Sequence, residues 1–190
     1  MTEQRSLDVQ REEFSRRRLI ATPIAGMIAW TIVGIGSLLL QPFALSMLLF
    51  AVTGSIAYLG MFISRFTGEN FLDKNKPKNT FDTLFFYFVG MAVLVYAIAI
   101  PFFRIDYTSL PLTVGILTGI MWLPISWIIQ HWIGWVHAIV RTVAIVLVWY
   151  LFPEHRFLAV SAVIVILYVF AIAVLESRWR GVSRGLQGGA

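Results

Sequence analysis

Six long apolar stretches follow one another along this chain, and they constrain its fold more than any other feature. They cover approximately residues 19–40, 44–63, 81–103, 110–129, 134–152 and 157–175. A helix needs about twenty apolar residues to cross a bilayer. Three of the connections are very short, so the helices that they join form antiparallel hairpins. The sequence therefore predicts an all-α, polytopic membrane bundle of six transmembrane helices.

The basic residues indicate how this bundle is oriented. Of the fifteen Lys and Arg residues, twelve lie before the first stretch, between the second and third, or after the sixth. Only Arg104 and Arg156 lie in the loops of the other side, and Arg141 lies within the fifth stretch. Lys and Arg in short loops are retained on the cytoplasmic side of a membrane. We therefore expect both termini to be cytoplasmic and the chain to be a multi-pass inner-membrane protein.

This pattern divides the chain into three parts. They are a basic cytoplasmic segment, 1–18, a six-helix transmembrane domain, 19–175, and a basic cytoplasmic tail, 176–190. The net charge of +5 comes from the loops and tails. Anionic lipid headgroups are nearer partners for those charges than nucleic acid. We interpret residues 1–18 as a basic segment that sets the membrane topology and binds lipid headgroups. In the alternative interpretation, these residues form a short interfacial helix.

Several common motifs of catalysis and of nucleotide binding are missing from the sequence. It contains no cysteine, and no HExxH or phosphate-binding glycine-rich motif. The common classes of membrane metalloprotease and nucleotide-driven protein need such metal ligands or phosphate-binding loops. We therefore predict no catalytic residue, no metal and no cofactor, and we favour a protein that is not an enzyme.

Arg141 is the residue with the highest cost of insertion. An arginine at a helix centre costs about 2.5–3.5 kcal/mol, so it is a candidate functional residue. His137, four residues earlier, shares its helical face. Asp82 is the only carboxylate near membrane depth and is the predicted partner of Arg141. In the alternative readings, Arg141 reaches toward the cytoplasmic surface, and Asp82 simply favours the N-terminal end of its helix.

Polar and small residues recur on one face of the fourth stretch at helical spacing. Gly115 and Gly119 form a GxxxG motif, which is typical of close helix packing, within one chain or in a dimer. Ser126 and Gln130 continue this face toward the cytoplasm. We therefore predict a cytoplasm-facing polar pocket between the third, fourth and fifth helices, lined by Arg141, His137, Gln130, Ser126, Tyr87 and Asp82.

Several short motifs resemble those of a known family. The N-terminal segment contains the acidic residue Asp8 and the basic residue Arg11. The first apolar stretch contains four spaced residues, namely Pro23, Gly26, Trp30 and Gly34. A Gly-x-x-aromatic-Leu-Pro run is formed by Gly119, Trp122, Leu123 and Pro124. In these positions the chain resembles family 7010, a bacterial family of small membrane proteins of unknown function. Met121 stands where the family pattern often has a polar residue. The resemblance implies a six-span fold and no activity.

Two functions from different classes follow from these observations. In the first, the pocket binds or passes a small anionic solute or a lipid headgroup, with Arg141 as the charged contact and His137 as a proton acceptor. In the second, the chain is a structural or regulatory membrane subunit whose glycine-rich faces build a homodimer or dock a partner. Membrane lipids are expected partners in both.

Overall fold

A computed structural model of the chain describes residues 5–73 and 76–187, and this described part is all-α, without strands. Its elements are α1 (Leu7–Ser15), α2 (Ala21–Gly36), α3 (Pro42–Gly54), α4 (Ile56–Phe66), α5 (Thr80–Leu94), α6 (Tyr96–Ile105), α7 (Ser109–Ile120), α8 (Trp122–Ile129), α9 (Ile133–Leu151), the short 3-10 helix η1 (Pro153–His155) and α10 (Arg156–Gln187). The predicted fold class is confirmed in its all-α character.

Each of the six predicted apolar stretches is helical, and three of them are divided into two helices. Four helical segments are long and apolar enough to cross a membrane, namely 80–105, 109–129, 133–151 and 153–184. The pair α3 and α4 supplies a fifth when it is taken as one span with a 47° bend. The remaining apolar helix, α2, has 16 residues and is shorter than these.

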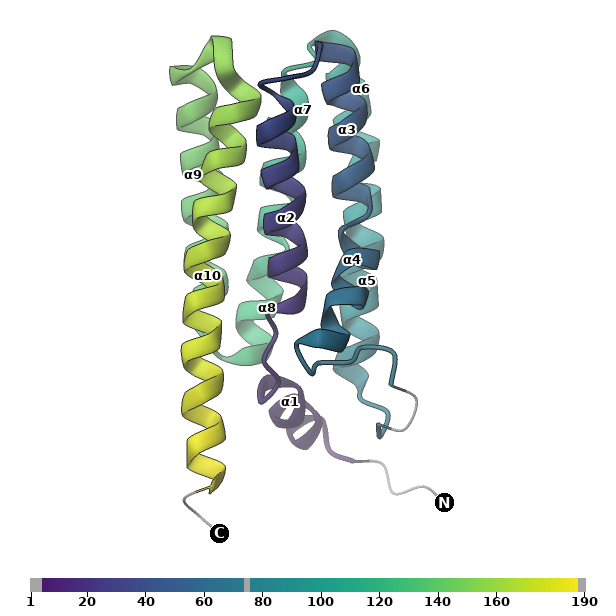
Figure 1. The fold of residues 1–190 in the computed structure, drawn as a ribbon. Coiled ribbons are helices and arrows are strands. Elements are labelled where there is room, and N and C mark those ends of the chain that lie inside the picture. The colour runs from purple at the N-terminus through teal and green to yellow at the C-terminus, as the bar shows by residue number, and fades with distance from the viewer. Residues whose placement is uncertain (1–4, 74–75, 188–190) are drawn as a thin grey trace.

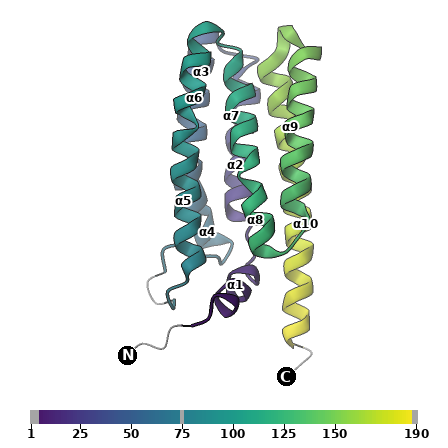
Figure 2. The ribbon, with the colours of Figure 1, turned by 180° about the vertical axis from the view of Figure 1, so that it is seen from behind.

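The helices stand side by side, and most of the basic residues belong to segments at one end of the bundle, called the basic end below (Figure 1). The basic end holds α1, the described loop residues 67–73 and 76–79, and the C-terminal end of α10. Seen from behind, the turn between α8 and α9 also lies toward the basic end (Figure 2). The links after α2, α6 and α9 lie at the opposite end.

Glycines on α2 allow α10 to lie close to it. A Cβ atom on Gly26 would lie 2.6 Å from the hydroxyl of Tyr168, and one on Gly34 would lie 3.2 Å from Cβ of Ser161. Trp30, between them on α2, is buried in the apolar core that α2 shares with α7, α9 and α10. Close packing of backbones through small residues is a common basis of helix association in membranes.

The N-terminal segment is fixed beneath the bundle by hydrogen bonds. Gln10 on α1 accepts a hydrogen bond from the backbone N–H of Thr80 at 2.8 Å, and its own carbonyl accepts one from Asn79 at 2.8 Å. Asn79 also caps α5 by accepting a hydrogen bond from the backbone N–H of Phe81. The guanidinium of Arg178 donates to the backbone carbonyl of Arg17 at 2.8 Å. Residues 7–15 are therefore an ordered helix at the basic end.

Candidate ligand-binding cavity

Arg141 is completely buried among the helices of the bundle. Its guanidinium donates hydrogen bonds to the hydroxyl of Tyr168 on α10 at 3.2 Å and to Oγ1 of Thr118 on α7 at 3.0 Å. Nη1 also lies 3.5 Å from Nε2 of His137, one turn earlier on α9. His137 and Arg141 therefore lie on one face of α9. Both side chains point into the bundle.

No carboxylate contacts Arg141 within the described chain. None of the ion pairs between described residues includes Arg141, and its Nε has no hydrogen-bond partner among them. The guanidinium carbon lies 5.3 Å from the ring centroid of Tyr168, so a cation–π contact adds to the hydrogen bond. A buried charge normally has an ion partner. Within the described chain, this charge has hydroxyl, imidazole and aromatic partners instead.

Aromatic packing and a glycine hold this group in place. The ring of His137 stacks on Trp122, with centroids 4.1 Å apart, and lies 5.3 Å from the ring of Tyr168. A Cβ atom on Gly119 would lie 2.9 Å from Cδ of Arg141. The arginine stem therefore occupies space that any larger residue at position 119 would fill.

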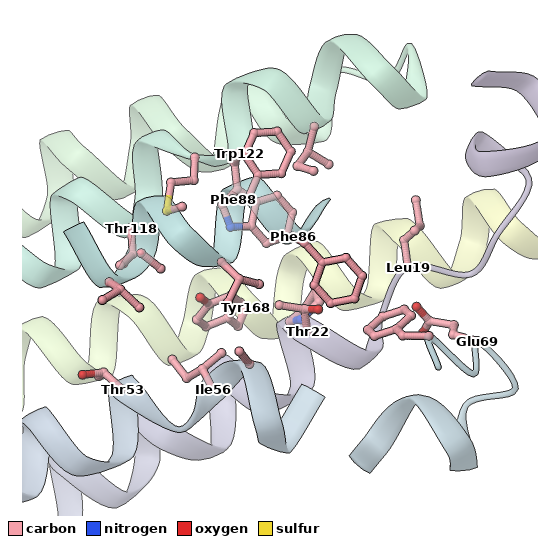
Figure 3. Close-up of a pocket in the computed structure, with 18 of the residues that line it drawn as sticks. Leu19, Thr22, Thr53, Ile56, Glu69, Phe86, Phe88, Thr118, Trp122 and Tyr168 are labelled. Carbon is pink, nitrogen blue, oxygen red and sulfur yellow. The ribbon is translucent and has the colours of Figure 1, made fainter. Parts of the chain in front are cut away.

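A cavity of about 220 Å³ lies beside this group. It runs from the basic end toward the middle of the bundle. Helices α2, α3, α4, α5 and α6 form one part of its wall, and α7, α8 and α10 form another. Most of its wall is apolar. Figure 3 shows Thr53 and Thr118 toward one end of the cavity and Leu19 and Glu69 toward the other.

The cavity and the Arg141 group share side chains. Thr118, Trp122 and Tyr168 all line the cavity, while Arg141 lies behind them with no exposed surface. The hydroxyl of Thr118 donates to the carbonyl of Val114 at 2.7 Å while it accepts from Arg141. Tyr168 accepts from the guanidinium, and its own proton remains available to a group in the cavity. Thr118 and Tyr168, which both accept hydrogen bonds from Arg141, thus lie between this charged residue and the cavity.

Glu69 lies at the other end of the cavity, in the loop after α4. It is 4% exposed. Oε1 accepts hydrogen bonds from the backbone N–H groups of Ile20 and Ala21 at 3.0 and 2.9 Å, and so caps the start of α2. Oε2 is buried without a hydrogen-bond partner among the described residues. Burial raises the pKa of the Glu69 carboxyl, and the two backbone N–H groups and Thr67 oppose that rise.

Asp82 is held at the same end of the cavity by Arg17. The two guanidinium Nη atoms of Arg17 contact the two carboxylate oxygens of Asp82, one of them at 3.0 Å. The prediction that Asp82 is the partner of Arg141 is therefore wrong. Asp82 lies near the start of α5 and faces the N-terminal segment, whereas Arg141 faces α7 and α10. Asp82 does line the cavity, as Arg17 does.

The other predicted pocket residues do not meet at Arg141. Tyr87 is 67% exposed on the outside of α5. Gln130 is exposed and ends α8 in a left-handed conformation, with φ 49°. Ser126 is buried but serves the turn between α8 and α9, where it donates to the carbonyl of His131 and accepts from the N–H of Trp135. The cavity therefore differs from the predicted pocket in most of its lining and also involves α2, α4 and α10.

Three lining residues were not predicted from the sequence. Thr118 lies four residues before Trp122, so helical spacing alone could have placed both on one face of the α7–α8 pair. Tyr168 is one aromatic residue in a long apolar helix, where no pattern distinguishes it. Glu69 lies in a polar loop, and acidic residues in such loops are normally solvated.

The chain belongs to a family of unknown function, DUF7010, whose model matches residues 8–178. The match begins within α1 and extends into the last third of α10, so it includes every wall of the cavity. The resemblance found in the sequence is thus confirmed. No curated protein and no solved structure matches the chain.

Proposed function

We propose that this member of the family is a multi-pass inner-membrane protein that crosses the membrane six times with both ends in the cytoplasm. Twelve basic residues of the sequence belong to the segments at the basic end, and such residues remain on the cytoplasmic side. The bent pair α3 and α4 counts as one span. α2 crosses with help from the apolar residues 37–40 that follow it.

We further propose that the cavity binds a small amphipathic anion, with its acidic group at Tyr168 and its apolar part against the aromatic and aliphatic wall. One observation carries this proposal. Arg141 is a buried cation without an ionic partner in the described chain, and two of its hydrogen-bond partners, Thr118 and Tyr168, line the cavity. An anion in the cavity would supply the missing negative charge.

The geometry assigns different tasks to the three side chains. Tyr168 accepts from Arg141 and donates its hydroxyl proton to the acid, and a phenol that accepts from a cation is a stronger donor. Thr118 holds the second Nη of Arg141 and so orients it. Arg141 attracts the anion through its charge, because attraction between charges is stronger in a poorly polarisable environment than in water.

The size and lining of the cavity limit the kind of anion. A volume of about 220 Å³ is smaller than the pockets that hold drug-sized ligands, which span roughly 300–1,000 Å³. The lining is mostly apolar and includes the rings of Phe88, Trp122 and Tyr168. A carboxylic acid with one aromatic ring or a short branched chain fits both properties better than a strongly hydrated inorganic anion.

Three probes with the same ring test this proposal. Benzoate, benzyl alcohol and phenyltrimethylammonium are titrated into the detergent-purified protein, and the heat of binding is measured. We expect benzoate to bind more tightly than the alcohol, and the cation to bind least. Equal binding of benzoate and benzyl alcohol would mean that the buried charge does not act on the cavity, and preference for the cation would contradict the proposal.

A further inference from the structure

The carboxyl group of Glu69 has an arrangement that capping alone does not explain. Oε1 accepts both backbone hydrogen bonds at the start of α2 and a third, at 3.0 Å, from the hydroxyl of Thr67. Oε2 has no donor among the described residues, although the side chain is more than nine-tenths buried and lines the cavity. A buried carboxylate oxygen without a donor is costly. Protonation of Oε2 removes that cost.

The charged groups around Glu69 leave its own charge only partly balanced. Arg18 faces it from the N-terminal segment but makes a two-point ion pair with Glu176 on α10, at 2.6 and 3.0 Å. Lys76, in the same loop, donates to the backbone carbonyl of Glu69 at 2.7 Å. At the same end of the cavity, Arg17 and Asp82 neutralise each other.

A negative charge on Glu69 would oppose an anion in the same cavity. The wall between the two ends is mostly apolar, so screening by water is weak there and repulsion between like charges is large. Protonating Glu69 replaces the charge by a hydroxyl group. The anion and the proton therefore favour each other's binding, and the linkage is reciprocal.

We propose that Oε2 of Glu69 is a proton-binding site of the cavity, and that the protein takes up one proton together with each anion that it binds. This inference rests on the proposed function, because it names the ion that accompanies the ligand. The proton comes from the solution and converts the carboxylate to a carboxylic acid. The pKa of Glu69, which burial raises, agrees with this role.

The first test measures benzoate binding by the purified protein from about pH 6 to about pH 9, where benzoate itself stays ionised. Above the pKa of Glu69, we expect the dissociation constant to increase by up to about tenfold per pH unit, the limit for one linked proton. In Glu69→Gln the constant should stay at its low-pH value throughout, because Gln keeps the carbonyl that caps α2. Glu154→Gln, which removes an exposed acid at the opposite end, should behave like the parent.

The second test needs no ligand. Infrared difference spectra between about pH 6 and about pH 9, where exposed carboxyl groups stay ionised, should contain the carbonyl band of a protonated carboxyl group at the lower pH. That band should be missing in Glu69→Gln and present in Glu154→Gln. If the band is missing in the parent as well, Oε2 is satisfied by water and the proton site is refuted.

The two tests separate failure of this inference from failure of the proposed function. Benzoate binding with the same affinity at every pH would refute the coupling and leave anion binding intact. A protonated Glu69 in a protein that binds no benzoate at any pH would support the proton site while it contradicts the proposed function. It would also contradict the uptake of a proton with that anion.

Discussion

Cδ of Arg141 lies 2.9 Å from the position that a Cβ atom on Gly119 would occupy, so the glycine of α7 and the arginine of α9 share one space. The preceding glycine of the motif behaves similarly, since a Cβ on Gly115 would lie 2.9 Å from Ile145 and 3.2 Å from Ile164. This glycine face therefore packs against α9 and α10 of its own chain. The second glycine of the GxxxG motif therefore leaves room for the buried side chain of Arg141.

We predict that Gly119→Ala destabilises the protein by about 1–3 kcal/mol, the usual range for overpacking a tight site. Gly90→Ala on α5 is the matched control, because a Cβ there has no atom within 4 Å, and it should change stability by no more than about 0.5 kcal/mol. Thermal unfolding in detergent measures both. Equal tolerance of the two alanines would show that Arg141 is not held against α7.

The ion pair between Arg17 and Asp82 predicts energetic coupling between the N-terminal segment and α5. In a double-mutant cycle, Arg17→Gln and Asp82→Asn should couple by about 0.5–1 kcal/mol, a value limited by the partial exposure of Asp82. The cycle of Asp82→Asn with Arg141→Gln should be additive. Coupling in the second cycle and additivity in the first would restore the pairing with Arg141 that the sequence suggested.

Much of the fold was predictable from the sequence, because apolar length and the placement of charge are local properties. Each of the six apolar stretches is helical in the structure. The breaks inside the stretches were harder. The division between α7 and α8 lies at Met121, three residues before Pro124. The divisions after Gly54 and Leu94 have no comparable proline signal at the break.

The site was less predictable, because spacing shows which residues share a face but not what that face meets. His137 and Arg141 share a face and do contact each other. Tyr87 was placed in the pocket by the same reasoning, yet it lies on the outside of α5. Asp82 was paired with Arg141 by membrane depth alone, and Arg17 reaches it from the N-terminal segment, a contact that follows only from the tertiary fold.

Stability should depend on pH through Glu69. Because its pKa is raised above the ordinary value of 4.5, the folded chain holds the proton more tightly than the unfolded chain. The contribution of Glu69 to the free energy of unfolding is thus largest below pH 4.5 and declines as the pH rises through the folded value. Unfolding titrations at several pH values should show this decline in the parent and a flatter profile in Glu69→Gln. An identical pH profile in both would contradict the assignment.

The proposed topology predicts where reporter fusions are active. A reporter that works only outside the cytoplasm should be inactive when fused after Arg184 and active when fused after Asp106, in the link between α6 and α7. A cytoplasmic reporter should give the opposite pattern. Activity of the external reporter at Arg184 would mean that the two ends of the bundle are assigned to the wrong sides of the membrane.

The affinity for benzoate of Tyr168→Phe, at constant pH, tests the central claim most directly. Phenylalanine keeps the ring beside His137 and removes only the hydroxyl that joins Arg141 to the cavity. Tyr87→Phe, on the exposed side of α5, is the matched control. We predict that Tyr168→Phe weakens binding by about tenfold or more, since a hydrogen bond to a charged group contributes about 1.5–3 kcal/mol, and that Tyr87→Phe binds like the parent. Unchanged affinity in Tyr168→Phe would contradict the claim that Arg141 acts on the cavity through this hydroxyl.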